Sequence, residues 1–137
     1  MAEKAAEENK VKGETFLAEN KTKSGVTTTE SGLQYKVITE GTGEKPSADD
    51  QVTVHYQGKF VDGTVFDSSY ERGEPMTFPL GGVIRGWTEG LQLMPVGSKY
   101  ILWIPAELGY GMQPPSPTIP PNSMLEFEVE LLEIVKE

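Results

Sequence analysis

A strand followed by a tight turn can be read directly from residues 51–69, QVTVHYQGKFVDGTVFDSS. Every second residue of its first half is apolar: Val52, Val54 and Tyr56. This alternation places the apolar side chains on one face of an extended chain and the polar ones on the other. The pair Asp62-Gly63 then favours a tight turn. We therefore expect a strand of an antiparallel sheet that ends at this turn.

Four other segments alternate in the same way and are also expected to be strands. They begin at Leu33, Phe78, Tyr100 and Leu125. The last one has the clearest pattern, since single glutamates separate its apolar residues up to Leu131. Leu132 follows directly and breaks the alternation, so we expect a bulge there. The chain has 15 glycines and 10 prolines, and so many turn residues indicate short strands.

One helix is expected among these strands, in VIRGWTEGLQLM, residues 83–94. Its apolar residues recur at the spacing of one helical face: Trp87, Leu91 and Met94. Pro95 and Gly97 end the helical pattern. We therefore expect an α+β fold in which an antiparallel sheet of five to six strands wraps around one short helix.

The N-terminal segment has a different character. Residues 3–20 are rich in Ala, Glu and Lys and predict a helix, and the small polar residues 21–31 predict a linker. This helix has too few apolar residues on one face to be stable by itself. Two interpretations stay open: a solvated helical arm, or the end of a longer helix that pairs with a partner. We expect an arm and linker over 1–31 and a folded domain over 32–137.

Composition and charge exclude several function classes. The formal charge of −9 comes from 12 basic and 21 acidic residues, and no basic cluster offsets it, so nucleic acid is not an expected partner. No apolar run approaches the roughly 18 residues of a membrane span. Because the chain has no cysteine and one histidine, it has neither a thiolate nucleophile nor a multi-histidine metal site. We expect His55 to be a surface or hydrogen-bonded structural residue.

Several motifs together resemble the FKBP family of prolyl isomerases, in order and spacing. They are VHYQGKFVDGTVFDSS (54–69), VIRGWTEGLQLMPVGSK (83–99), IPAELGYG (104–111) and IPPNSMLEFEVELLEI (119–134). The resemblance covers about residues 32–135. The preceding GETFLAENKTKSGVTTTESGLQYKVI (13–38) is similar to the linker helix of the bacterial macrophage-infectivity-potentiator subgroup.

The resemblance implies a substrate pocket and assigns its residues by position. The pocket residues would be Tyr56, Phe66, Arg72, Met76, Val83, Ile84, Trp87, Tyr110, Ile119 and Phe127. Among them Trp87 would form the floor, and the backbone N–H of Ile84 and the hydroxyl of Tyr110 would bind substrate carbonyls. Asp67, held by Tyr56 and Arg72, would act with Phe66 and Tyr110 in catalysis. Asp67 can also be interpreted as half of a structural ion pair that holds the pocket wall.

The implied activity is isomerisation of peptide bonds that precede proline, which assists protein folding. The barrier to this rotation is about 20 kcal/mol, because the C–N bond has partial double-bond character. The planar form is charge-separated, so water stabilises it more than the twisted form. A dry aromatic pocket removes part of this preference, and about 1.4 kcal/mol is worth a factor of ten in rate. No cofactor, metal or covalent intermediate is expected.

The resemblance also implies binding partners. We expect proline-containing polypeptides as substrates and macrolides such as tacrolimus or rapamycin as inhibitors. Met76, Pro115 and Thr118 depart from the family pattern and bear on macrolide affinity and substrate preference. In the subgroup a longer N-terminal helix dimerises, and here the dimerising part is expected to be missing or truncated. The compartment is not determined: the envelope is favoured if a leader was removed, and the cytoplasm otherwise.

Three other functions remain open. A binding module would hold proline or a macrolide in the same pocket without turnover. A chaperone or assembly scaffold would recruit its partner through the N-terminal helix. Finally, residues 114–121, PPSPTIPP, contain P-x-x-P spacings. They can be interpreted as a ligand for an SH3 or WW domain, or as a stiff loop over the pocket.

Overall fold

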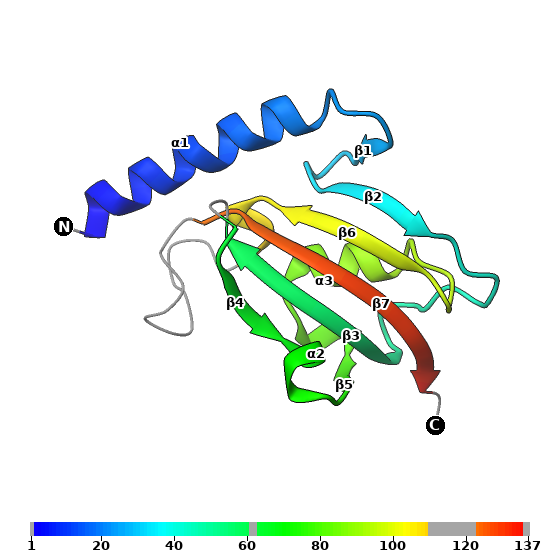
Figure 1. The fold of residues 1–137 in the computed structure, drawn as a ribbon. Coiled ribbons are helices and arrows are strands. Elements are labelled where there is room, and N and C mark those ends of the chain that lie inside the picture. Colours follow the sequence, from blue (N-terminus) through cyan, green and yellow to red (C-terminus); the bar gives the residue numbers. More distant parts are fainter. Residues whose placement is uncertain (1, 61–62, 110–122, 136–137) are drawn as a thin grey trace.

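The computed structural model describes residues 2–60, 63–109 and 123–135 (Figure 1). A sheet of seven antiparallel strands forms the body of the molecule. The strands are β1 (Val26–Thr28), β2 (Gln34–Thr39), β3 (Gln51–Phe60), β4 (Val65–Ser68), β5 (Met76–Pro79), β6 (Lys99–Ile104) and β7 (Leu125–Val135). The helices are α1 (Ala2–Asn20), α2 (Ser69–Arg72) and α3 (Arg85–Leu91), with short 3-10 turns η1 (Leu80–Gly82) and η2 (Ala106–Leu108). The α+β class expected from the sequence is confirmed.

The sheet is built around the long central strands β3 and β7, which pair over their whole length. The strand order is β1-β2-β6-β7-β3-β4, and β5 pairs with the same edge of β3 as β4 does. The register between β3 and β7 shifts at Leu132, so the bulge expected there is confirmed. A buried cluster fills the concave side of the sheet, and its fully buried members include Val52, Val54, Leu102 and Val129.

Helix α3 lies against the concave side of the sheet (Figure 1), as expected, with Leu91 fully buried. Two glycines let its backbone approach β6 closely. A Cβ at Gly86 would lie 2.7 Å from Ile104, and one at Gly90 would lie 2.8 Å from Leu102. Because these positions have no side chain, β6 packs directly against the helix backbone and the aromatic residue between the two glycines, Trp87, is held close to the sheet.

Helix α1 packs against the body of the same chain, which neither interpretation of the sequence anticipated. The buried side chain of Asn20 donates a hydrogen bond to Gln34 at 2.9 Å, and Gln34 donates in turn to the Leu17 carbonyl at 2.9 Å. Nearer the N-terminus of the helix, the backbone at Gly13 comes close to Met124: a Cβ at Gly13 would lie 3.0 Å from the Cβ of Met124. Polar pairing and close contact with the body, rather than a continuous apolar stripe, therefore hold this helix.

The sheet has one strand more than the five to six expected, because part of the expected linker is extended. Strand β1 lies within residues 21–31 and pairs with β2. A three-residue strand of small polar residues carries too little alternation to be recognised from the sequence. The expected division at 31/32 falls between these two paired strands. In the described residues, no helix is both long enough and apolar enough to cross a lipid bilayer.

Candidate active site

A cavity of about 280 Å³ opens between the concave face of the sheet and α3. Side chains from β3, β4, β5 and β7, together with the turn that leads into α3, line it. The lining residues are Tyr56, Phe66, Asp67, Phe78, Gly82, Val83, Ile84, Trp87 and Phe127. Asp67 is the one charged residue in this list, and the other side chains are aromatic or aliphatic.

Aromatic rings that meet edge to face build the floor of the cavity. The ring of Trp87 lies at 82° to Tyr56, 87° to Phe78 and 90° to Phe127, with centroids 5.2–5.5 Å apart. Such edge-to-face pairs are the favoured arrangement of aromatic side chains. Among the described residues the buried indole N–H of Trp87 has no hydrogen-bond acceptor. The floor is therefore a set of closely packed aromatic rings.

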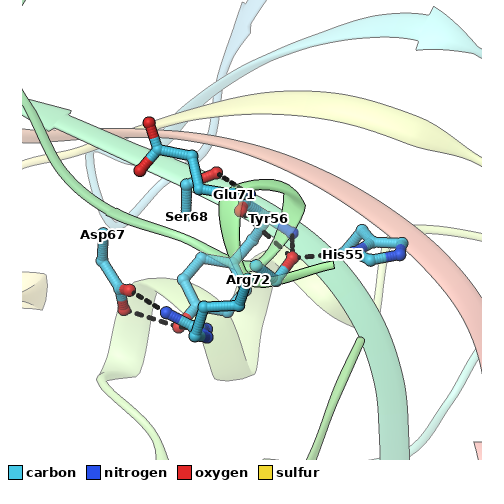
Figure 2. Close-up of polar contacts among 7 residues, drawn as sticks. His55, Tyr56, Asp67, Ser68, Glu71 and Arg72 are labelled. Carbon is cyan, nitrogen blue, oxygen red and sulfur yellow. Dashed lines mark hydrogen bonds and ion pairs between the residues drawn. The ribbon is translucent and has the colours of Figure 1, made fainter. Parts of the chain in front are cut away.

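A polar group of three residues borders this apolar surface (Figure 2). The Tyr56 hydroxyl donates to Asp67 at 2.5 Å, Arg72 donates to the other carboxylate oxygen at 2.5 Å, and Arg72 also donates to the Tyr56 hydroxyl at 3.1 Å. Side chains of Asp67 and Arg72 remain 39% and 44% exposed. One carboxylate is thus held in a fixed orientation at the mouth of the cavity.

The electrostatics of this group keep Asp67 ionised. Burial alone would raise the pKa of the carboxyl, but hydrogen bonds from Tyr56 and Arg72 favour the charged form and bring the pKa below its usual value. Burial, followed by the hydrogen bond to Asp67, raises the pKa of Tyr56, so its hydroxyl keeps the proton that it donates. The site therefore presents a carboxylate, and not a carboxylic acid, at neutral pH.

This pKa shift predicts how stability depends on pH. A carboxyl whose pKa is lowered by folding stabilises the protein above its unfolded pKa of about 3.9, and the contribution is lost as the pH falls through the folded value. Thermal unfolding of wild type and Asp67→Asn should therefore differ by a constant, small amount from about pH 8 to pH 5, because the pair is partly exposed. The difference should shrink below about pH 4. A difference that grows on acidification would contradict the assignment.

Most of the residues expected in the pocket come together at this cavity. Those that line it are Tyr56, Phe66, Val83, Ile84, Trp87 and Phe127, with Asp67. Arg72 lies behind the carboxylate and bonds to it. Met76 is half-buried against the core and is not among the lining residues. Tyr110 and Ile119 lie outside the described residues, as do Pro115 and Thr118, so their positions are not described.

Phe78 is the lining side chain that the sequence did not single out as part of the site. It follows Met76 by two residues, so both side chains point to the same face of β5. Phe78 pairs with Val52 and its ring contacts Trp87, whereas Met76 pairs with Val54 at the other end of the strand. Alternation identifies the inward face, but only the pairing register and the position of α3 decide which residue reaches the cavity.

His55 lies on the opposite face of β3, as the alternation predicts. Its Nδ1 atom is 2.9 Å from the Ser69 hydroxyl, and its ring stacks on Tyr70 at 4.8 Å. The expectation of a hydrogen-bonded structural histidine is confirmed. In the described part of the chain, no three His, Asp or Glu side chains gather in a way that could hold a metal ion.

The fold and the site together define a class of protein: an antiparallel sheet curved around one short helix, with an aromatic cavity between them that bears a fixed carboxylate. Residues 42–132 match the family model of the FKBP-type peptidyl-prolyl cis-trans isomerase. Residues 1–37 match the model of the domain amino-terminal to FKBP-type peptidyl-prolyl isomerase. The chain therefore belongs to the FKBP-type peptidyl-prolyl cis-trans isomerase family, and the resemblance read from the motifs is confirmed.

Individual relatives are similar over almost the whole chain. The FKBP-type isomerase FkpA of Aeromonas hydrophila is 58% identical over 135 residues, which cover 98% of this chain and 50% of the relative. The outer membrane protein MIP of Legionella longbeachae is 51% identical, covering 97% of this chain and 57% of the relative. The crystal structure of FkpA from Escherichia coli superposes with a TM-score of 0.93 at 48% identity, covering 97% of this chain and 62% of that one. The chain thus spans about half to two thirds of the length of these relatives.

Proposed function

We propose that this chain catalyses rotation about peptide bonds that precede proline in other polypeptides and so assists their folding. The observation that carries the proposal is the cavity between α3 and the sheet, in which five aromatic and two aliphatic side chains surround one oriented carboxylate. Its volume of about 280 Å³ is just below the roughly 300–1,000 Å³ of pockets that hold small ligands.

Catalysis in such a site follows from desolvation. The planar prolyl amide is charge-separated and water stabilises it, whereas the twisted amide has lost that resonance. A pocket walled by Trp87, Phe78 and Phe127 takes the amide out of water and so lowers the free energy of the twisted form relative to the planar one. Rotation needs no bond to the protein, so the mechanism uses neither a covalent intermediate nor proton transfer.

Polar groups at the rim orient the substrate. Asp67 lies where it can face the carbonyl that rotates, and its negative charge interacts differently with the planar and the twisted amide. The backbone N–H of Ile84, at the start of α3, is the proposed donor to a substrate carbonyl. Tyr110 is a second donor proposed from the family resemblance. Phe66 and Phe127 favour an apolar residue before the proline.

Refolding of a protein limited by proline isomerisation tests the proposal. Catalytic amounts of the chain should accelerate the slow phase, in proportion to its concentration, without changing the final yield. An unchanged slow phase, together with binding of a prolyl peptide measured by calorimetry, would instead identify a binding module. The same assay thus separates turnover from simple occupancy of the pocket.

We also propose that macrolides such as tacrolimus or rapamycin bind in this cavity and compete with prolyl substrates. Its walls are apolar, and the carboxylate and the start of α3 supply polar contacts at the rim. Loss of isomerase activity on titration with tacrolimus would support this, and activity that persists at saturating inhibitor would contradict it.

We propose in addition that residues 1–31 act as an arm to the isomerase domain 32–137, and that a longer helix of this kind can dimerise. In support, the apolar side chain of Val11 on α1 is 52% exposed, so this face of the helix is not covered by the rest of the chain. Sedimentation at increasing concentration tests this, since a strict monomer would remove the support for dimerisation through α1.

A further inference from the structure

Strand β3 carries the pocket tyrosine at a point where one edge of the strand changes partner. On that edge Gln51–Val54 pair with β5 and Gln57–Lys59 pair with β4. His55 and Tyr56 lie in the gap between the two ladders, beside α2. Backbone N–H and C=O groups at such a gap need another partner, because an unpaired buried group costs free energy.

Ser69, the first residue of α2, fills this gap with its hydroxyl. The backbone N–H of Tyr56 donates to the Ser69 Oγ atom at 2.7 Å, and the hydroxyl lies 3.3 Å from the Tyr56 carbonyl oxygen. The Ser69 residue is fully buried. One side-chain oxygen therefore meets both polar backbone groups of Tyr56, as a neighbouring strand would.

We propose that Ser69 is a positioning residue for the isomerase site, a role that rests on the proposed function. Its hydroxyl holds the backbone of Tyr56 in place of a strand, and the Tyr56 side chain then holds Asp67 at the rim of the cavity. Ser69 is not among the residues that line the cavity and has no hydrogen bond to the carboxylate, so its hydroxyl acts through Tyr56.

His55 is a further hydrogen-bond partner of the Ser69 hydroxyl. This hydroxyl has one proton and two acceptors within reach, the Nδ1 atom of His55 at 2.9 Å and the Tyr56 carbonyl at 3.3 Å. When Nδ1 carries no proton, it accepts from Ser69. When Nδ1 carries the ring proton, it donates to Ser69, and the hydroxyl proton turns to the Tyr56 carbonyl.

Aromatic and charged side chains surround His55. Tyr70 stacks on it from α2, Glu130 lies directly across from it on β7 and accepts a hydrogen bond from Tyr70, and the Lys99 ammonium lies over the Tyr70 ring. Through the Ser69 hydroxyl, His55 is thus linked by hydrogen bonds to the backbone of Tyr56, whose side chain lies on the other face of the sheet (Figure 2).

Kinetics of a chromogenic prolyl peptide test the proposal. In Ser69→Ala, kcat should fall about tenfold while KM stays within about twofold, because the walls from β5 and α3 that bind substrate are unchanged. Ser69→Thr keeps the hydroxyl and should recover most of kcat. Ser68→Ala is the matched control: it removes a neighbouring buried hydroxyl that caps α2 by accepting from the Glu71 N–H, without touching Tyr56. Equal losses in Ser68→Ala and Ser69→Ala would overturn the proposal.

Amide hydrogen exchange tests the hydrogen bond between Ser69 and the Tyr56 backbone independently of activity. The Tyr56 amide should be protected in the wild type and should exchange about tenfold faster in Ser69→Ala, measured by NMR at constant pH. Unchanged exchange would overturn the proposal. A wild-type chain with no isomerase activity would contradict the proposed function instead, and the exchange result would still stand.

Should Ser69→Ala fail to fold, Ser69→Cys replaces it, because a thiol is close to the hydroxyl in shape but its sulfur accepts hydrogen bonds only weakly. The Tyr56 amide should then exchange faster than in the wild type. Unchanged exchange in Ser69→Cys would overturn the proposal.

Discussion

Replacement of Asp67 by alanine is expected to lower kcat/KM for a prolyl peptide by about tenfold or more, which corresponds to roughly 1.4 kcal/mol or more of transition-state stabilisation. The carboxylate is the one charged group among the cavity lining residues, and Tyr56 and Arg72 fix its orientation. Because the side chain is partly exposed, its loss should leave the fold intact. A peptide isomerisation assay and thermal unfolding of the same preparations measure both effects.

Two further variants separate the carboxylate from the ion pair. Arg72→Ala removes the pair but leaves Asp67 bonded to the Tyr56 hydroxyl, so its loss of activity should be clearly smaller. Glu71→Ala removes another carboxylate from the same region and should leave the rate unchanged. If Arg72→Ala lowers kcat/KM as much as Asp67→Ala does, Asp67 serves as half of a structural ion pair in the pocket wall, and its proposed catalytic role is wrong.

Replacement of Gly58 by alanine is expected to disturb both stability and activity, because this position lies beneath two rings of the site. A Cβ there would lie 2.7 Å from Phe66 and 2.8 Å from Phe127. Both rings would have to move, and Phe127 is buried in the core. Such overpacking typically costs about 1–3 kcal/mol, and we expect at least about a tenfold fall in kcat/KM besides, since the displaced rings line the cavity.

Gly81→Ala is the matched control for this change. A Cβ at Gly81 would lie 3.6 Å from the Ala48 carbonyl oxygen, which is ordinary contact, although the residue is close to the cavity in sequence. Denaturant unfolding and the peptide assay should therefore show little change. A Gly58→Ala protein that keeps wild-type activity and stability would mean that the rings have room to shift without cost.

Local sequence patterns predicted the strands and the central helix because each reports on its own segment. Alternation around Tyr56 placed that residue inward and His55 outward, and both placements are found. The i, i+4, i+7 spacing that begins at Trp87 identified α3, although the helix ends at Leu91, before the predicted end. Spacings of two and of three to four residues are properties of a strand or a helix by itself, so they can be recognised without knowing the neighbours.

Features that depend on two distant segments were missed or left undecided. The composition of residues 21–31 predicts a linker, whereas pairing with β2 makes part of this segment the strand β1. The packing of α1 depends on Gln34 reaching Asn20 and Leu17, which no periodicity reports. That Phe78 and not Met76 lines the cavity likewise depends on the pairing register of β5 and on the position of α3.

The sequence by itself determined the family, the faces of the long strands and most of the aromatic residues that surround the cavity, because each of these is carried by a contiguous motif. Only the tertiary structure decided that Phe78 completes the floor, that Asp67 is locked between Tyr56 and Arg72, and that Ser69 bridges the gap between two strand ladders. The physical reason is that hydrogen bonds and ring contacts join atoms within a few ångströms in space, whatever their separation along the chain. Chain order alone contains no such distance.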